Sequence, residues 1–350
     1  MSKKLVLALT LTIALLSTVG LAFKIQWVKA TETVYIRPDG TVFPPTPLIQ
    51  KNGDIYTILG NISSDIDGIV IQRNDMTLNG AGNVVQGQDN GVGISLDRTS
   101  NVTIENIMIK AFRDGIQINE AFNNHVFGIN VTESKHFGVS LYLSSKNSIE
   151  RINIIDGNGY GICLGYSSDN SIVSNNITNY DDGIWLYSSL NNNITENRIS
   201  ANETYGIRMD ESSNNNTISR NILTRMGLFV TASYRNIIED NTVNGEPLAY
   251  LESVSDYTVG NAGQVVLVNC DNIRVENLNL SNTTVGLELW GTSNCKIANN
   301  SVTNNWCGIT LVESSNNVII QNNITGSKWY GIRFDKSQGN FLVKNHITNH

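Results

Sequence analysis

The sequence predicts an all-β protein, a right-handed parallel β-helix solenoid of about eleven coils with three short strands per coil. The first observation behind this prediction is a glycine followed by Ile, Val or Leu, which recurs every 22 or 23 residues within two runs. The repeat glycines are Gly93, Gly115, Gly138, Gly161, Gly183 and Gly206 in the first run, and Gly286, Gly308 and Gly331 in the second. A fixed period of this length is typical of a solenoid, in which each coil packs only on its neighbours.

The second observation is that each period contains three apolar stations. In the coil that starts at Gly183, the stations are Ile184 with Leu186, then Ile194, then Ile199. The two-residue spacing of Ile184 and Leu186 places both side chains on the same face of one strand. Three such strands per coil, stacked on their counterparts, form three parallel sheets around a shared interior.

The third observation is an asparagine about nine residues after the repeat glycine. Asn tolerates the left-handed backbone of a sharp corner, and stacked Asn side chains can hydrogen-bond from coil to coil. We therefore predict a structural Asn ladder at one corner of the coil. Its predicted members are Asn124, Asn147, Asn170, Asn192, Asn215, Asn236, Asn272, Asn317 and Asn340.

Two other solenoid classes fit less well. Leucine-rich repeats need leucine at fixed positions and a helical or 3₁₀ turn, whereas here Ile and Val dominate and no segment has helical periodicity. Left-handed hexapeptide helices would have a period of about 18 residues.

Residues 1–30 form a targeting segment. Lys3 and Lys4 precede an apolar run of 19 residues, from Leu5 to Phe23. The pattern predicts a secretory signal, and the run also approaches the roughly 20 residues that a retained membrane anchor needs. In both cases we expect the rest of the chain to be secreted or displayed at the cell surface, with membrane contact only through an uncleaved N-terminal segment.

The remaining chain divides into two parts. Residues 31–90 begin with four of the five prolines and are predicted as an N-terminal cap and first coils. Residues 91–350 carry the repeats, with an inserted loop near 244–260 that is either a binding face or a tolerated elaboration. The sequence ends inside a repeat without a polar cap, so a chain that covers the open last coil is a candidate partner.

Composition excludes several partners. Charged residues make up 16% of the chain and the net charge is −7; without residues 1–30, which hold four lysines and no acid, it is −11. An acidic body argues against nucleic acid, whose phosphates need clusters of Lys and Arg. It also disfavours uronic-acid polymers unless cations bridge them.

Cysteine and histidine give no metal or cofactor prediction. Cys163, Cys270, Cys295 and Cys307 lack the close spacing of a zinc or redox motif, and we expect small buried side chains, with a Cys270–Cys295 disulfide as the alternative. The four histidines are scattered, without the Met/Cys/His clustering of a copper site. They are His125, His136, His346 and His350.

A family resemblance covers nearly all of residues 31–350. The coils with Gly-Ile-x-Leu and Asn-x-Ile, the segment from Asn244 to Leu251 and the segment from Gly263 to Cys270 resemble the NosD-type β-helix domain, part of the carbohydrate-binding and sugar-hydrolase (CASH) group. The entry segment from Val34 to Gly40 is similar to that of secreted archaeal members. The resemblance implies the fold and export; the family label also evokes copper delivery, for which the sequence offers no ligand cluster.

The candidate binding residues come from the outward positions of the glycine strands, two and four residues after the glycine. Trp185, Tyr187, Arg208 and Asp210 cluster there on adjacent coils. Aromatic rings beside charged hydrogen-bonding groups suit sugars, which have apolar CH faces and hydroxyl rims. The alternative is exposed aromatics beside a surface Arg208–Asp210 pair.

Enzymatic function is the competing interpretation. A glycosidase needs two carboxylates at roughly 5–10 Å, for which Asp182 and Asp210 are weak candidates, and no complete catalytic motif accompanies them. A lyase needs a base with a cation nearby, and Arg208 and Arg333 are candidates for that cation.

We therefore predict an exported, non-catalytic β-helix scaffold for cell-surface adhesion or glycan binding, with glycans or cell-surface proteins as partners. The alternatives are a polysaccharide-cleaving hydrolase or lyase and a structural assembly module. Glycosylation is also predicted where sequons are exposed, whereas ladder positions such as Asn215 should be inaccessible. The sequons start at Asn61, Asn101, Asn130, Asn176, Asn193, Asn202, Asn215, Asn279, Asn282, Asn299 and Asn323.

Overall fold

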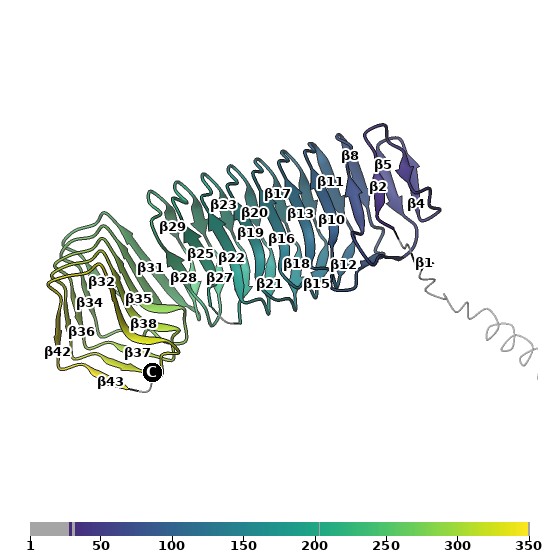
Figure 1. Ribbon diagram of the computed structural model, residues 1–350. Helices are drawn as coiled ribbons and strands as arrows, with labels where there is room; N and C mark the ends of the chain where they lie inside the picture. The colour runs from purple at the N-terminus through teal and green to yellow at the C-terminus, as the bar shows by residue number, and fades with distance from the viewer. Residues whose placement is uncertain (1–27, 30–31, 203, 349–350) are drawn as a thin grey trace, which may run out of the picture.

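The computed structural model describes residues 28–29, 32–202 and 204–348, and these residues form 43 strands and no helix. Figure 1 shows two stacks of parallel coils set at an angle to each other. We call residues 32–243 the first stack and residues 246–348 the second stack. Together they make a parallel β-solenoid of about thirteen turns.

The targeting segment predicted for residues 1–30 lies outside the described residues except for β1 (Val28–Lys29). Within the described part of the chain, no helix has the length and hydropathy that crossing a membrane requires.

Two ten-stranded sheets belong to the first stack alone. Sheet 1 contains the glycine strands, in the order β3 (Val42–Phe43), β2 (Val34–Ile36), β7 (Ile69–Ile71), β10 (Val92–Asp97), β13 (Asp114–Asn119), β16 (Phe137–Tyr142), β19 (Tyr160–Gly165), β22 (Asp182–Tyr187), β25 (Ile207–Asp210) and β28 (Leu228–Val230). Sheet 2 contains β4 (Ile49–Asn52), β5 (Ile55–Ile58), β8 (Met76–Asn79), β11 (Val102–Glu105), β14 (His125–Phe127), β17 (Ser148–Glu150), β20 (Ser171–Val173), β23 (Asn193–Thr195), β26 (Thr217–Ser219) and β29 (Ile237–Glu239).

Sheet 3 has fifteen strands and runs through both stacks. It begins with β1, which precedes the first stack, and its first-stack strands are β6 (Ile62–Ser63), β9 (Val84–Gln86), β12 (Met108–Lys110), β15 (Asn130–Thr132), β18 (Asn153–Ile155), β21 (Asn176–Thr178), β24 (Arg198–Ser200), β27 (Ile222–Leu223) and β30 (Thr242–Val243). Its second-stack strands are β31 (Glu246–Glu252), β33 (Gln264–Val268), β35 (Val285–Trp290), β38 (Cys307–Val312) and β41 (Tyr330–Asp335).

Two smaller sheets complete the second stack. Sheet 4 contains β32 (Thr258–Val259), β34 (Arg274–Glu276), β36 (Lys296–Ala298), β39 (Val318–Ile320) and β42 (Phe341–Val343). Sheet 5 contains β37 (Ser301–Thr303), β40 (Asn323–Thr325) and β43 (His346–Thr348).

There are more turns than the eleven predicted because segments outside the glycine repeat also form coils. Before the repeat, β2 pairs in parallel with β7, and β7 pairs in parallel with β10. After the interruption, β31 pairs in parallel with β33. The glycine repeat therefore undercounts the coils at both places.

The apolar stations fill the interior of the first stack. Ile184, Leu186 and Ile194 are completely buried. A Cβ atom on Gly183 would lie 2.3 Å from Cγ2 of Ile199 and 2.4 Å from a backbone oxygen of the next coil. The repeat therefore needs glycine because the third station packs against its backbone across the interior.

An asparagine ladder lies at the corner between sheets 1 and 2. Asn170 Oδ1 accepts the backbone N–H of Asn147 at 2.9 Å and its side-chain N–H at 3.1 Å, and Asn192 accepts the same two bonds from Asn170. These bonds satisfy buried polar groups at the turns. The linked members are Asn124, Asn147, Asn170, Asn192, Asn216 and Asn236 in the first stack, and Asn317 and Asn340 in the second.

The predicted ladder member Asn215 is exposed, and Asn216 takes its place. The corner after β25 has one extra residue, with successive positive φ angles of 51° at Glu211 and 65° at Ser212. The extra residue shifts the ladder by one position, so the expected inaccessibility of Asn215 was wrong.

The predicted ladder member Asn272 is also exposed, and its Nδ2 donates to Asp256 instead. In the pairing of β33 with β35, Val265 lies opposite Leu287. Gln264 rather than Gly263 therefore occupies the repeat-glycine position, and the whole coil is displaced by one residue from the predicted register.

The two stacks are joined by a tight hairpin where the sequence predicts an inserted loop. Asn244 and Gly245 have φ angles of 54° and 88°, which are the positive values that a type I′ turn requires. The turn pairs β30 antiparallel with β31. The expected loop near 244–260 therefore contains a seven-residue strand that begins the second stack.

The second stack covers the open end of the first. Val265 and Leu267 of β33 belong to the apolar core of the second stack, whereas Val266 and Val268 belong to that of the first. A strand with both faces buried explains the unbroken apolar run at this point. The end of a solenoid otherwise exposes its core, so this contact supplies the cap that the first stack needs.

Gln264 closes the hydrogen-bonding edge of β28. Its Oε1 accepts the N–H of Leu228 at 2.8 Å, and its Nε2 donates to the carbonyl oxygens of Leu228 at 2.7 Å and Val285 at 2.9 Å. One side chain thus pairs with both backbone groups of the edge residue, as a neighbouring strand would.

Candidate functional site: a groove between the two stacks

A groove lies between the outer face of sheet 1 and the second stack, and we call it the inter-stack groove. It consists of two hollows of about 360 and 250 Å³ that share Tyr205, Trp306 and Trp329. The lining residues are Gly159, Tyr160, Asp181, Asp182, Thr204, Tyr205, Arg208, Phe229, Val285, Trp306, Cys307, Thr310, Trp329, Tyr330 and Arg333. One wall of the groove carries aromatic rings of the first stack, and the opposite wall carries aromatic rings of the second stack.

The strand pattern positions the rings. Tyr160, Tyr205 and Tyr330 each stand immediately before a repeat glycine. Strict alternation would place this position on the same face as the apolar station two residues later. The repeat glycine itself faces the interior, as Gly183 does toward Ile199, so the alternation is broken there and the residue before the glycine faces outward. Because Gly206 and Gly331 belong to different stacks, the angle between the stacks turns the two sets of outward rings toward one groove.

Several rings are already in contact. Tyr160 stacks on Trp185 with ring centroids 4.8 Å apart, and Tyr205 lies at the same distance from Phe229. On the opposite wall, the centroid of Trp329 is 5.3 Å from that of Trp306. Trp329 is 59% exposed and is therefore available to a ligand.

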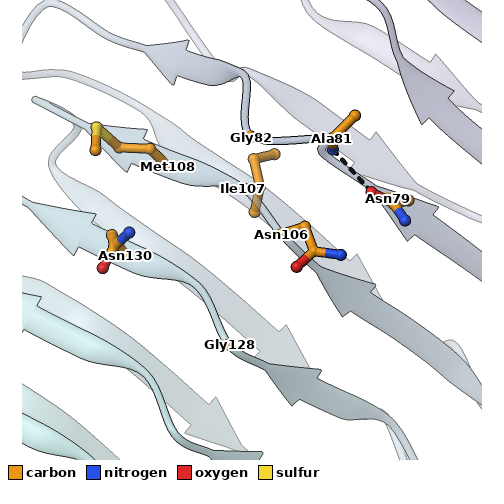
Figure 2. A pocket seen from close by; sticks show the side chains of 8 residues that line it. All are labelled: Asn79, Ala81, Gly82, Asn106, Ile107, Met108, Gly128 and Asn130. Atoms are coloured by element: carbon orange, nitrogen blue, oxygen red, sulfur yellow. Dashed lines mark hydrogen bonds between the residues drawn. The ribbon is translucent and has the colours of Figure 1, made fainter.

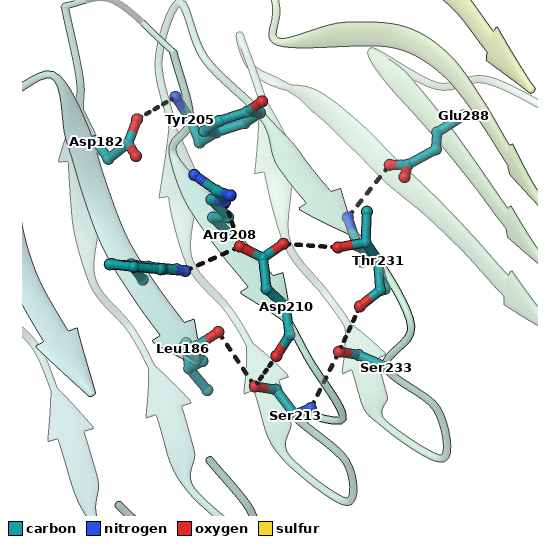
Figure 3. A network of polar contacts seen from close by, with 11 residues as sticks. Asp182, Leu186, Tyr205, Arg208, Asp210, Ser213, Thr231, Ser233 and Glu288 are labelled. Carbon is teal, nitrogen blue, oxygen red and sulfur yellow. Dashed lines mark hydrogen bonds and ion pairs between the residues drawn. The ribbon is translucent and has the colours of Figure 1, made fainter. Parts of the chain in front are cut away.

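Asp210 is the centre of a polar network beside the groove (Figure 3). Its Oδ2 lies 2.5 Å from Nε of Arg208 in an ion pair and accepts the indole N–H of Trp185 at 3.0 Å. Its Oδ1 accepts the hydroxyl of Thr231 at 2.6 Å. The Arg208 guanidinium also lies over two rings, 5.3 Å from the centroid of Trp185 and 5.1 Å from that of Tyr205.

Asp182 is a buried carboxyl at the groove wall. Its Oδ1 accepts the N–H of Tyr205 at 3.1 Å (Figure 3). Burial raises its pKa above the usual value, although the Thr204 hydroxyl, the Tyr205 N–H and the Arg208 charge act in the opposite direction. Burial also raises the pKa of the Tyr205 hydroxyl to about 12, so this tyrosine stays neutral in ordinary conditions.

Glu288 lies behind the network at the contact between the stacks. It is completely buried, and its Oε2 accepts the N–H of Val230 at 3.3 Å (Figure 3). Its Oε1 has no hydrogen-bond partner within the described part of the chain. Burial raises the pKa of Glu288 well above its usual value, and the nearby charge of Asp210 acts in the same direction.

The predicted site residues are only partly brought together. Trp185, Arg208 and Asp210 contact one another directly. Tyr187 lies beside Trp185, with centroids 5.7 Å apart, and also packs against Tyr166 at 5.4 Å. Of the four predicted residues, only Arg208 lines the groove, and Trp185 and Asp210 lie behind it. The predicted patch is therefore one edge of a larger site.

The weak catalytic candidates are separated by the register. In the pairing of β22 with β25, Tyr187 lies opposite Asp210, five residues beyond Asp182. At about 3.3 Å per residue, the backbone positions of Asp182 and Asp210 are about 16 Å apart along the strand direction. Asp210 is also held by three partners and is 6% exposed. This arrangement is unlike the carboxylate pair of a glycosidase.

Sequence reasoning missed most of the lining. The predicted outward positions lie two and four residues after the repeat glycine. The aromatic residues that line the groove lie before the glycine, and they are Tyr160, Tyr205, Trp306, Trp329 and Tyr330. The signal that could have found them is an aromatic residue one or two positions before the glycine. Which of these aromatics face each other depends on the angle between the stacks.

A separate hollow, of about 630 Å³, lies at a corner between sheets 2 and 3 of the first stack (Figure 2). It is lined by backbone turns at Gly82 and Gly128 and by side chains such as Asn79, whose Oδ1 accepts the N–H of Ala81 at 2.8 Å. The lining has no charged or aromatic side chain. We therefore place the candidate site in the inter-stack groove.

The cysteines are four buried, unpaired thiols, and the alternative Cys270–Cys295 disulfide is not formed. Cys295 replaces an asparagine of the ladder, because its Sγ accepts the N–H of Ile273 at 3.3 Å. Burial raises the pKa of Cys163 to about 12 and that of Cys295 to about 11. These buried thiols therefore belong to the packed interior of the solenoid.

Comparison with known proteins gives two family matches. The family described as right handed beta helix region matches residues 92–243, and the family described as periplasmic copper-binding protein (NosD) matches residues 250–350. No curated protein matches the chain.

Three solved structures illustrate the similarity in fold. The periplasmic alginate epimerase AlgG is 12% identical, with 92% of this chain and 85% of that chain covered and a TM-score of 0.38. The A-module of the Azotobacter vinelandii mannuronan C-5 epimerase AlgE4 is 15% identical, with 92% and 84% covered and a TM-score of 0.41. DFA-IIIase from Arthrobacter chlorophenolicus A6 is 12% identical, with 72% and 61% covered and a TM-score of 0.44. At these identities the likeness concerns the fold alone.

The residues present do not fit a copper site. Copper ions prefer clustered thiolate, thioether and imidazole ligands. Residues 250–350 contain no Met, their cysteines are buried thiols with raised pKa values, and no group of three or more His, Cys, Asp or Glu among the described residues could hold a metal ion. The family match therefore identifies the architecture. Residues 92–243 are thus a right handed beta helix region, and residues 250–350 are a region of the NosD type.

Proposed function

We propose that this chain is an extracytoplasmic, non-catalytic protein that binds a glycan in the inter-stack groove. The observation that carries the proposal is the presence of aromatic rings on both walls of the groove beside charged hydrogen-bonding groups. Rings such as Trp329 and Tyr205 offer flat apolar faces for the CH side of a sugar ring. Asp182 and Arg208 offer polar groups for the hydroxyl rim.

A ligand in this groove would touch both stacks. The two hollows share Tyr205 from the first stack and Trp306 from the second, so a chain of several sugars fits the continuous lining better than a single small ring. Contacts from two walls also exclude water from the hydrogen bonds, which strengthens them.

The proposed location outside the cytoplasm is supported by the two lysines and the apolar run of residues 1–30. The NosD family, which matches residues 250–350, is described as periplasmic. Cell fractionation of the full chain tests this proposal, and recovery in the cytoplasmic fraction alone would contradict it.

Glycan binding is tested by a glycan array followed by calorimetry with Trp306→Ala and Trp329→Ala. Each variant should lose about fivefold in affinity, because a ring contact of this kind is worth on the order of 1 kcal/mol. Phe122→Ala is the matched control, because Phe122 is 53% exposed on the first stack and lies outside the groove. Unchanged binding in both Trp variants would contradict the proposed site.

The same assay separates the groove from the smaller patch predicted by sequence. Trp185→Ala should weaken binding, because Trp185 holds Asp210 and supports Arg208. Tyr187→Ala should retain affinity within about twofold, because Tyr187 does not line the groove. Equal losses in the two variants would favour the patch.

Asp182 favours a polysaccharide-cleaving enzyme as the second candidate function. It lines the groove, and its raised pKa is a property of acid–base catalysts. Arg208 and Arg333, the candidate cations of a lyase, are both paired with carboxylates. Turnover in reducing-end or unsaturated-product assays that disappears in Asp182→Asn would establish this second function and contradict the non-catalytic proposal.

A further inference from the structure

We infer that the inter-stack groove takes an uncharged glycan, a polymer of neutral hexoses or pentoses, rather than a uronic-acid polymer. This inference rests on the proposed glycan-binding function and adds the class of ligand. It rests on the observation that the two arginines of the groove already form ion pairs with carboxylates of the protein.

Both groove arginines have an internal carboxylate partner. Arg208 Nε lies 2.5 Å from Oδ2 of Asp210, and Arg333 Nη2 lies 3.1 Å from Oδ2 of Asp335. Recognition of a uronate needs a cation with free bonding capacity, and bidentate Arg–carboxylate pairs are the strongest form of that contact. In each pair one guanidinium nitrogen faces an internal carboxylate, so the positive charge of the arginine is already neutralised within the protein, while its other N–H groups can still donate to hydroxyls.

A ligand carboxylate could compete for Arg208 only at the expense of Asp210. The Asp210 side chain is 8% exposed and also holds Trp185 and Thr231. Removing the cation would leave a buried carboxylate without its counter-ion, which is strongly unfavourable. The ion pair thus protects the groove against anionic ligands.

The remaining charge at the groove is mostly acidic. Asp181 and Asp182 line it, and each accepts one backbone N–H, from Gly159 at 2.9 Å and from Tyr205 at 3.1 Å. Their other acceptor sites suit hydroxyl donors and repel carboxylates. The cation Lys328 lies 4.0 Å from the ring centroid of Trp306, in a cation–π contact. The net charge of −7 adds a long-range field of the same sign as the acids.

The inference is tested by calorimetry on the full chain with neutral hexasaccharides (cello-, manno- and xylohexaose) and with hexamers of galacturonate, mannuronate and guluronate, each in 20 mM and 500 mM NaCl. At least one neutral hexamer should bind at least tenfold more tightly than every uronate in 20 mM NaCl. Its affinity should change less than about twofold with salt, because no ion pair forms with the ligand.

Tighter, salt-sensitive uronate binding that Trp329→Ala abolishes would overturn the inference while the glycan-binding function stands. No binding by any hexamer or any glycan of the array would overturn the function and the inference together.

Asp335→Asn provides a gain-of-function test. Asp335 is not a lining residue, and its loss frees Arg333 at the groove. Uronate affinity in 20 mM NaCl should rise several-fold and return to the wild-type value in 500 mM NaCl, with neutral binding unchanged. The matched control is Glu313→Gln, which removes the same charge from an exposed pair with Lys336 away from the groove. Equal effects of the two variants would contradict the role of Arg333 pairing.

Discussion

At the scale of single residues, the carboxyl groups of the groove have three different environments. Asp210 is ion-paired and accepts two further hydrogen bonds, Asp182 is buried with one backbone bond, and Glu288 is fully buried with one unpaired oxygen. Burial therefore favours the neutral form of Glu288. None of these environments can be read from residue type alone.

Glu288 makes the stability of the stack contact depend on pH. Its pKa is near 4.5 when unfolded and well above that when folded, so between the two values the folded state binds a proton that the unfolded state has released. This group's contribution to stability is thus lost as pH rises through that window, and it stays low above it.

Glu288→Gln should remove this loss, because an amide of similar shape stays neutral. The variant should match wild type near pH 4 and melt higher above the window, by roughly 2 °C or more for ~1 kcal/mol. Calorimetric melting from pH 4 to 9 measures this, with Glu239→Gln, an exposed residue of β29, as control. Parallel profiles for Glu288→Gln and wild type would contradict the burial argument.

At the scale of elements, the coil corners depend on amide ladders as much as the strands depend on their apolar faces. Asn192 accepts two bonds from Asn170, and its Nδ2 donates to the carbonyl of Ser167 at 2.9 Å and to Oδ1 of Asn216 at 3.1 Å. Each bond joins neighbouring coils. The ladder therefore fixes the register of sheets 1 and 2 where the short strands alone would permit slippage.

Asn192→Ala should destabilise the chain by roughly 3 kcal/mol, because it leaves several buried groups without partners at ~1–3 kcal/mol each. Chemical denaturation measures this difference. The control is Asn193→Ala, since Asn193 is the next residue along the chain and is exposed. A loss that is no larger for Asn192→Ala than for Asn193→Ala would show that the ladder contributes little.

At the scale of the whole molecule, the second stack both caps the first stack and forms one wall of the groove. Val266 and Val268 close the first core, and Gln264 closes the edge of β28. The same contact brings Trp306 and Trp329 into one groove with Tyr205. Stability and binding are therefore coupled through a single interface.

Gln264→Ala should loosen this interface. It leaves the buried N–H of Leu228 and two carbonyl oxygens without a side-chain partner and should cost roughly 3 kcal/mol. Hydrogen exchange should rise first in β28, and light scattering should detect self-association through the uncovered edge. The exposed Gln50→Ala is the control. Unchanged exchange in β28 would contradict the capping role.

The solenoid, its period and the residues of its core were predictable from the amino-acid sequence alone. Those features follow from strand alternation and from packing within one coil and its neighbours. The burial of Ile184, Leu186 and Ile194 could therefore be predicted from the sequence. The contact of Trp185, Arg208 and Asp210 was predictable for the same reason, because adjacent coils stack in register.

The angle between the stacks and the groove arise from tertiary packing. The one-residue shift at Gln264 and the meeting of Tyr205 with Trp306 depend on contacts between residues that are distant in the sequence. A periodic pattern specifies how a coil packs on the next coil, but it contains no information on how one stack packs against another. The candidate site lies at that second kind of contact.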